Sequence, residues 1–182
     1  NLGAALALMG KKVCLVDLDI GLRNLDVILG LDNRIIYDII DVAQGRAKLP
    51  QALIKDKRFG DNLFLLPAAQ NTDKSALEPK EAKQIVDELR SEFDYVLLDC
   101  PAGIEQGFAN AVAGADEAIV VSTPEISAVR DADRVVGLLE QQNLEESPML
   151  IINRIKKKMM HDGQMMDVDE ITRHLSIKLI VF

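Results

Sequence analysis

The chain has 182 residues, of which 48% are hydrophobic, and its 29 acidic and 21 basic residues give a net charge of −8. This length suits one globular domain with a sizeable core, so we expect a single domain over residues 1–182. The acidic balance argues against a nucleic-acid partner, no apolar run reaches the ~18 residues of a membrane span, and two cysteines in apolar runs argue against a disulfide framework.

Short apolar runs with turn-like ends recur along the chain and predict β-strands. The sequence opens on a helical pattern over residues 2–9, which Gly10 ends. The runs that follow are continuous rather than alternating, which is typical of strands buried on both faces of a sheet. They cover residues 13–16, 63–66, 95–98, 118–121, 149–152 and 178–181.

Helical patterns lie between these strands. Residues 106–115 are small and apolar enough for a packed helix, and two further segments repeat apolar residues at helical spacing. The repeats are Ala82, Ile85, Val86 and Leu89 after Pro79, and then Val129, Ala132, Val136 and Leu139. Because strands and helices alternate from end to end, we predict an α/β fold with a mostly parallel sheet.

Acidic and small polar residues follow the predicted strands. Asp17 and Asp19 end the first strand, and Asp99 ends the third. Ligands of such sheets bind at the carboxyl ends of the strands, and a carboxylate fixed there suits Mg²⁺. Asp17 and Asp19 face opposite sides if the chain stays extended, so one suits the metal and the other an attacking water. The alternative is that these aspartates only cap turns.

A glycine-rich phosphate loop is missing from the sequence. Neither G-x-x-x-x-G-K-[ST] nor G-x-G-x-x-G occurs in the 182 residues. Such a loop precedes the first helix of a P-loop protein, and the helical pattern here begins at the second residue. The apolar run over residues 177–182 also stops without a turn. We therefore expect a partial domain that is truncated at both ends.

Other features have simpler interpretations. Cys100 adjoins Asp99 but lies in an apolar strand without a nearby histidine, so we expect a buried thiol. The basic run over residues 154–158 is expected to be a solvated loop, and His161 and His174 stand alone. The charged residues at 130–134 predict a solvated helix face.

Four segments together resemble the ParA/MinD family, the deviant Walker A branch of the P-loop ATPases, and in particular its septum-site-determining members. The segments are residues 17–26 (DLDIGLRNLD), 52–58 (ALIKDKR), 99–105 (DCPAGIE) and 127–134 (SAVRDADR), in order over nearly the whole chain. The resemblance implies a doubly wound, mostly parallel sheet flanked by helices, of the P-loop NTPase-like SIMIBI type.

The resemblance also implies roles for individual residues. Asp19 matches the residue that positions the hydrolytic water. Asp17 and Asp99 match residues of the metal shell. The remaining matches are Pro101, Ala102 and Gly103 in the nucleotide-dependent second switch, Asn153 and Arg154 at the adenine, and Asn24 and Glu105 at the dimer interface.

The implied activity is an ATPase that selects the cell-division site. With ATP and Mg²⁺ such a protein forms a homodimer, binds the inner membrane surface through a C-terminal helix, recruits the division inhibitor MinC and responds to MinE or another regulator. Its location would be cytoplasmic and peripheral on the cytoplasmic face of the membrane. The Walker A loop and the C-terminal segment are absent from this sequence, so we expect the fragment itself to be inactive. Val181-Phe182 stands where the family has a Gly-Val turn.

Three alternatives remain at this point. The chain can be another ParA-like positioning ATPase. It can be a receiver-type phosphoacceptor domain, although 80 positions separate Asp19 from Asp99, which is long for that compact fold. It can also be a binding module without catalysis, for which the missing phosphate loop is the argument.

Overall fold

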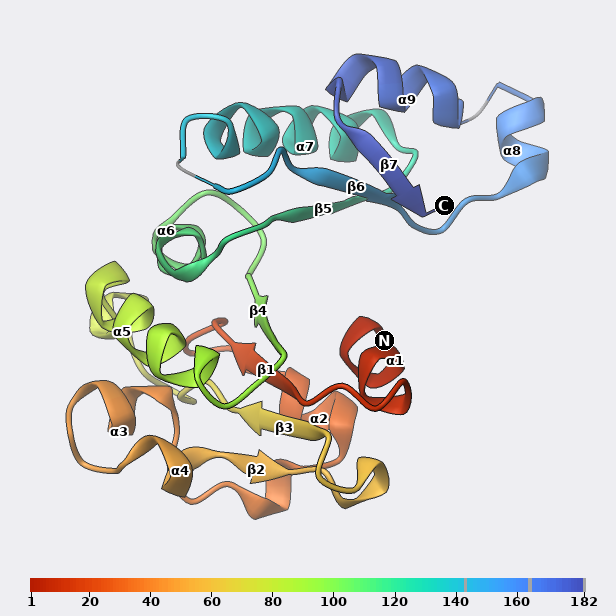
Figure 1. Cartoon of the computed structure of the whole chain (residues 1–182). Helices are drawn as coiled ribbons and strands as arrows, with labels where there is room; N and C mark the ends of the chain where they lie inside the picture. Colours follow the sequence, from red (N-terminus) through yellow and green to blue (C-terminus); the bar gives the residue numbers. More distant parts are fainter. Residues whose placement is uncertain (143, 164, 182) are drawn as a thin grey trace. The chain divides into compact units, whose positions relative to one another are not determined.

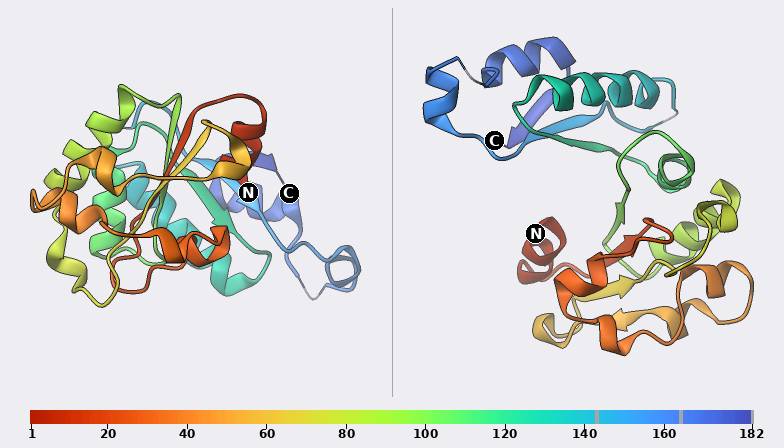
Figure 2. Two further views of the ribbon diagram at one scale, coloured as in Figure 1. Left: turned by 90° about the horizontal axis from the view of Figure 1, so that it is seen from below. Right: turned by 180° about the vertical axis from the view of Figure 1, so that it is seen from behind.

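The computed structural model describes residues 1–142, 144–163 and 165–181, and it divides the chain into two compact units (Figures 1 and 2). The units are Asn1–Gly114 and Ala115–Phe182, and each is described by itself. The expectation of one domain over residues 1–182 stays a prediction. The expected departure at Phe182 lies outside the described residues.

The first unit is built on a four-stranded sheet with the order β2-β3-β1-β4. Its strands are β1 (Val13–Asp17), β2 (Ile54–Lys55), β3 (Leu63–Leu66) and β4 (Tyr95–Asp99). The pairs β1–β3 and β1–β4 are parallel, whereas β2 is antiparallel to β3. The sequence did not predict β2, because two residues are too short to carry a periodic signal.

Helices of the first unit include the one predicted after Pro79. This helix is α5 (Pro79–Arg90), and all four of its periodic apolar side chains are buried. The others are α1 (Leu2–Leu8), α2 (Leu25–Leu29), α3 (Ile39–Ala43), α4 (Leu49–Ala52) and α6 (Gln106–Gly114), with 3₁₀ turns at Asp32–Arg34, Lys57–Phe59 and Lys74–Ala76. The packed helix expected over residues 106–115 is thus confirmed as α6.

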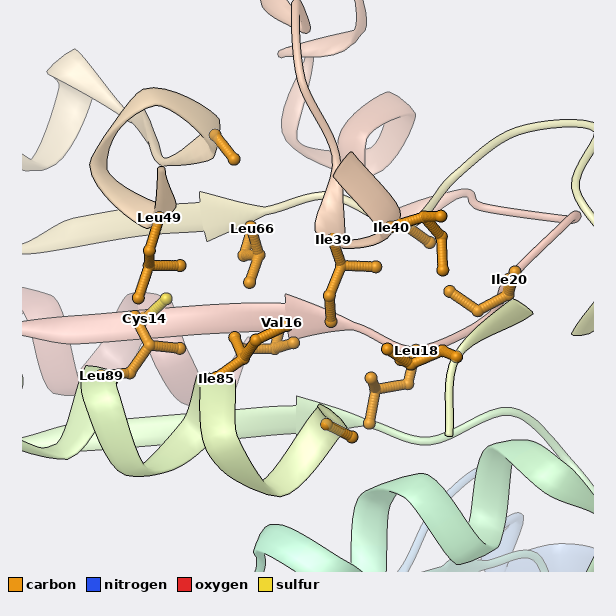
Figure 3. Packing of buried hydrophobic residues seen from close by; sticks show 14 of the residues in the cluster. Cys14, Val16, Leu18, Ile20, Ile39, Ile40, Leu49, Leu66, Ile85 and Leu89 are labelled. Atoms are coloured by element: carbon orange, nitrogen blue, oxygen red, sulfur yellow. The ribbon is translucent and has the colours of Figure 1, made fainter. Parts of the chain in front are cut away.

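Strand β1 divides the core of this unit into two layers. Cys14 and Val16 belong to a cluster with buried residues of α3, α4 and α5, as Figure 3 shows. Val13 packs on the opposite side with Ala7 of α1. Successive side chains of a strand point to opposite faces, so both faces of the sheet are covered by helices. The doubly wound, mostly parallel arrangement is therefore confirmed.

The second unit contains a three-stranded parallel sheet with the order β5-β6-β7. Its elements are β5 (Ile119–Ser122), α7 (Ile126–Leu139), β6 (Met149–Ile152), α8 (Lys157–His161), α9 (Val168–Leu175) and β7 (Lys178–Val181). The four periodic apolar residues of α7 are buried, and the charged residues between them are exposed, as predicted. No helix in the described part of the chain is long and apolar enough to cross a membrane.

Two strands differ from the expectation of burial on both faces. Tyr95 of β4 is 43% exposed and Val121 of β5 is 62% exposed. Both strands lie at an edge of their sheet, so each is paired on one side only. Cys100 directly follows β4 and is exposed, so the expectation of a buried thiol was wrong.

Candidate functional site

The acidic ends of β1 and β4 lie next to each other in the first unit. Asp17 and Asp99 are register partners in the parallel pair β1–β4. The Leu18 N–H donates to the Asp99 carbonyl over 3.1 Å, which joins the two strand ends just beyond the ladder. The structure thus brings together the two carboxylates that the sequence placed at one edge of the sheet.

Asp17 anchors the segment that follows it, which we call the Asp19 loop (residues 18–24). Its side chain is only 1% exposed. One carboxylate oxygen accepts the Asp19 N–H over 2.9 Å, and the other accepts the Leu25 N–H over 3.3 Å. Burial raises the pKa of Asp17, the backbone donors oppose this shift, and the charge of Asp99 adds to it. Both oxygens have internal donors, so this carboxylate holds the loop in place, and its assignment to the metal shell stays a prediction.

Asp99 is accessible to solvent, in contrast to Asp17. Partial burial raises the pKa of Asp99, and the nearby charge of Asp19 raises it further. A strand-end carboxylate that faces other acidic groups favours the approach of a cation. Mg²⁺ keeps several waters and is held by one or two carboxylates together with phosphate, so Asp99 fits this ion. Within the described residues, no group of three His, Cys, Asp or Glu side chains forms a metal site.

A small hollow opens between the Asp19 loop and the segment after β4, which we call the Pro101 loop (residues 100–105). The sequence predicted four of its lining residues, Asp19, Pro101, Ala102 and Glu105. The full lining is Leu18, Asp19, Ile20, Lys74, Pro101, Ala102, Glu105, Gly107, Phe108 and Asn110. The sequence argument missed Lys74 and Asn110. An asparagine among small apolar residues of a packed helix was a usable signal for the second of these.

The surroundings of Asp17 and Asp19 differ, but not through an extended chain, because β1 ends at Asp17 and the Asp19 N–H donates back to the Asp17 side chain. Asp17 is buried and bonded to backbone, and Asp19 lines the hollow. Gly103, the last of the three predicted second-switch positions, has a φ of +97° and is not part of the lining. The catalytic and metal roles assigned to these residues stay predictions.

The two expected dimer-interface residues lie on the surface of the first unit. Asn24 stands directly before α2, and Glu105 directly before α6. Both side chains are exposed, and Glu105 also lines the hollow. Both are therefore accessible to a second chain, and their role there stays a prediction.

Asn153 and Arg154 belong to the second unit, where they follow β6. The Asn153 N–H donates to the Ser122 carbonyl of β5 over 2.8 Å, and the Asn153 side-chain oxygen accepts the Arg154 N–H over 2.8 Å. Arg154 has a φ of +57°, an uncommon value for a residue other than glycine. The three predicted site aspartates, Asp17, Asp19 and Asp99, thus belong to the first unit, and this tight Asn-Arg turn belongs to the second.

Comparison with known proteins identifies the class first. The sequence profile of the AAA domain matches residues 1–168. Together with the doubly wound sheet and its acidic strand ends, this match defines a domain of the P-loop ATPase type.

Closer relatives identify the family. The chain is 65% identical to the septum site-determining protein MinD of Bacillus subtilis over 180 residues, which are 99% of this chain and 67% of the relative. It therefore belongs to the MinD family, and it spans about two thirds of the length of the relatives that it matches. These findings exclude the receiver-type alternative.

Solved structures agree with this assignment. MinD in a MinC:MinD cell division complex of Aquifex aeolicus is 48% identical, with a TM-score of 0.89 over 100% of this chain and 73% of that chain. The septum site-determining protein MinD of Pyrococcus horikoshii, in complex with Mg-ADP, is 29% identical, with a TM-score of 0.85 over 100% of this chain and 72% of that chain.

Proposed function

We propose that the protein to which this chain belongs is an ATPase that selects the cell-division site. One observation carries the proposal: in a member of the MinD family, Asp17 and Asp99 are register partners at one sheet edge, and Asp19 lines the hollow beside them. The Mg-ADP complex of the Pyrococcus relative supports ATP and Mg²⁺ as the cofactors. The phosphate-binding loop would come from residues outside these 182, because no such pattern occurs among them.

The residues of the first unit would divide the work of hydrolysis. Bound Mg²⁺ neutralises phosphate charge when the nucleotide is present. Asp99 would hold this ion or one of its waters. Asp19 would orient the attacking water and accept its proton. Asp17 would keep the Asp19 loop in place through its two backbone hydrogen bonds. Asn153 and Arg154 would contact the adenine.

The proposed cycle also needs a second copy and other partners. Asn24 and Glu105 are exposed on the first unit and would face the partner in an ATP-dependent homodimer. The MinC:MinD complex of Aquifex supports recruitment of MinC. MinE or another regulator would stimulate hydrolysis and so release the protein from the membrane. The cytoplasmic face of the membrane would be bound through residues outside this chain. A ParA-like positioning ATPase of another kind is the second candidate, which the family assignment disfavours.

Substitution of Asp19 in the full-length protein tests the proposal. Asp19→Ala should lower kcat by about 10²–10⁴-fold and leave KM nearly unchanged, because a group that orients the nucleophile acts in the transition state. The variant should accumulate as an ATP-bound dimer on anionic vesicles. Asp32→Ala, which removes an exposed carboxylate outside the hollow, is the matched control.

Three results would contradict parts of this proposal. Turnover of Asp19→Ala equal to that of Asp32→Ala would remove Asp19 from the mechanism. A parallel loss of ATP affinity and turnover would place Asp19 in the metal shell instead. Vesicle binding that is the same with ATP and with ADP would reject the proposed membrane cycle.

A further inference from the structure

The segment between β3 and α5, residues 67–78, contacts the Asp19 loop, and we call it the bridging loop. The Gly21 N–H donates to the Ala69 carbonyl over 2.9 Å. Gly21 and Leu22 both form isolated β-bridges with Gln70. The middle of the Asp19 loop is therefore paired with the bridging loop almost as a strand is paired in a sheet.

Gly21 makes this approach possible. Its φ of +90° is a conformation that residues with a Cβ rarely adopt. A Cβ at this position would also lie 2.8 Å from the Thr72 carbonyl oxygen, which is backbone of the bridging loop. The absence of a side chain at Gly21 is therefore what lets the two loops lie this close to each other.

The other end of the bridging loop is held by α6. The Leu77 carbonyl accepts the side-chain amides of Gln106 and Asn110, each over 3.1 Å. The Gln106 amide also lies 3.2 Å from the Asn110 side-chain oxygen. Asn110 is only 1% exposed. A buried amide is costly without hydrogen bonds, so these contacts fix the position of the Leu77 carbonyl.

Helix α6 is in turn packed against the Pro101 loop. The helix begins directly after this loop. A Cβ on Gly107 would lie 2.9 Å from Pro101 Cδ and closer still to Pro101 Cγ. The position of α6 therefore determines where the Pro101 loop can lie.

The geometry points to Asn110 and Gln106 as positioning residues that hold the bridging loop and, through it, fix the Asp19 loop relative to the Pro101 loop. Asn110 lines the hollow, but its polar atoms bond to Leu77 and Gln106. The Asp19 loop and the Pro101 loop would then shift together when either is displaced. The coupling between these loops does not depend on the function proposed above. Only an effect on ATP turnover would rest on that function.

Amide hydrogen exchange in the full-length protein without nucleotide tests this coupling. Asn110→Leu removes, at similar size, the buried donor to the Leu77 carbonyl and the acceptor of the Gln106 amide. Exchange of the Gly21 N–H should become roughly 3- to 10-fold faster, the range that one net hydrogen bond supports. Asn62→Leu is the matched control. It removes an asparagine donor to the Ala7 carbonyl, at 3.3 Å, in the same unit but outside the bridging loop. It should change Gly21 exchange by less than about twofold.

A second pair of variants tests the coupling in the reverse direction. Gly21→Ala should speed exchange of the Asn110 side-chain amide, since coupling between two positions is reciprocal. Gly45→Ala imposes a similar backbone strain at a φ of +69° but meets no atom within 4 Å, so it should leave that amide unchanged.

Equal Gly21 exchange in Asn110→Leu and Asn62→Leu would overturn the inference, because Asn110 would then be structural only. If Asn110→Leu does not fold, Gln106→Leu removes the other donor to the same carbonyl and should still speed Gly21 exchange. An unchanged Gly21 exchange rate in Gln106→Leu would also overturn the inference. If the ATPase proposal fails, the exchange results still decide whether the two loops are coupled.

Discussion

Replacement of Gly107 by alanine is a direct test of the packing between α6 and the Pro101 loop. An added Cβ would approach Pro101 Cδ to 2.9 Å, well inside an ordinary contact distance, and Pro101 is a rigid ring. Overpacking of this kind costs about 1–3 kcal/mol. Alanine in place of a helical glycine gains up to ~1 kcal/mol, and less in the first turn, where Gly107 lies. We therefore expect the free energy of unfolding to fall by about 1–2 kcal/mol.

Urea unfolding followed by tyrosine fluorescence measures this change. The chain has two tyrosines and no tryptophan, and both Tyr37 and Tyr95 belong to the first unit, so the signal reports on that unit. Gly137→Ala is the control. This glycine lies inside α7 with no atom within 4 Å of an added Cβ, so circular dichroism should show a gain of up to ~1 kcal/mol.

A stabilised Gly107→Ala variant would refute the reasoning, because it would mean that the Pro101 ring moves aside without cost. Gly114→Ala gives an intermediate case. Its added Cβ would lie 3.0 Å from Val86, a contact that small shifts can relieve, so it should destabilise less than Gly107→Ala. The reverse order of the two variants would show that Pro101 is not the constraint.

Three further predictions concern the acidic edge. Titration calorimetry of the 182-residue chain with Mg-ATP should show no binding, because no phosphate loop offsets the acidic groups, and micromolar affinity would contradict this. In the full-length protein, Asp99→Asn should weaken Mg²⁺-dependent turnover by removing a hard oxygen ligand, and an unchanged Mg²⁺ dependence would make Asp99 a turn cap. Partial burial, then the charges of Asp99 and Asp19, raise the pKa of Cys100 from 9.0 to about 11. Iodoacetamide should therefore alkylate Cys100 more slowly at pH 8 than it alkylates an unperturbed thiol, and the rate should rise up to about pH 11. Asp99→Asn should speed the reaction, and an ordinary rate in the wild type would contradict this.

The sequence by itself determined most of the strands, four of the helices (α1, α5, α6 and α7) and the edge where chemistry is possible. Continuous apolar runs predicted six of the strands, and helical spacing predicted α5 and α7 together with the residues that each buries. Both signals depend on local periodicity, which the chain carries wherever one face must be buried.

Only the tertiary structure decided which segments meet. The antiparallel strand β2, the exposure of Cys100 and the placement of Lys74 and Asn110 around the hollow all depend on contacts between residues far apart in the chain. The bonds from Gln106 and Asn110 to Leu77 span 29 and 33 positions. No periodic pattern encodes such pairs, because the geometry that selects them exists only once the sheet and its helices have packed.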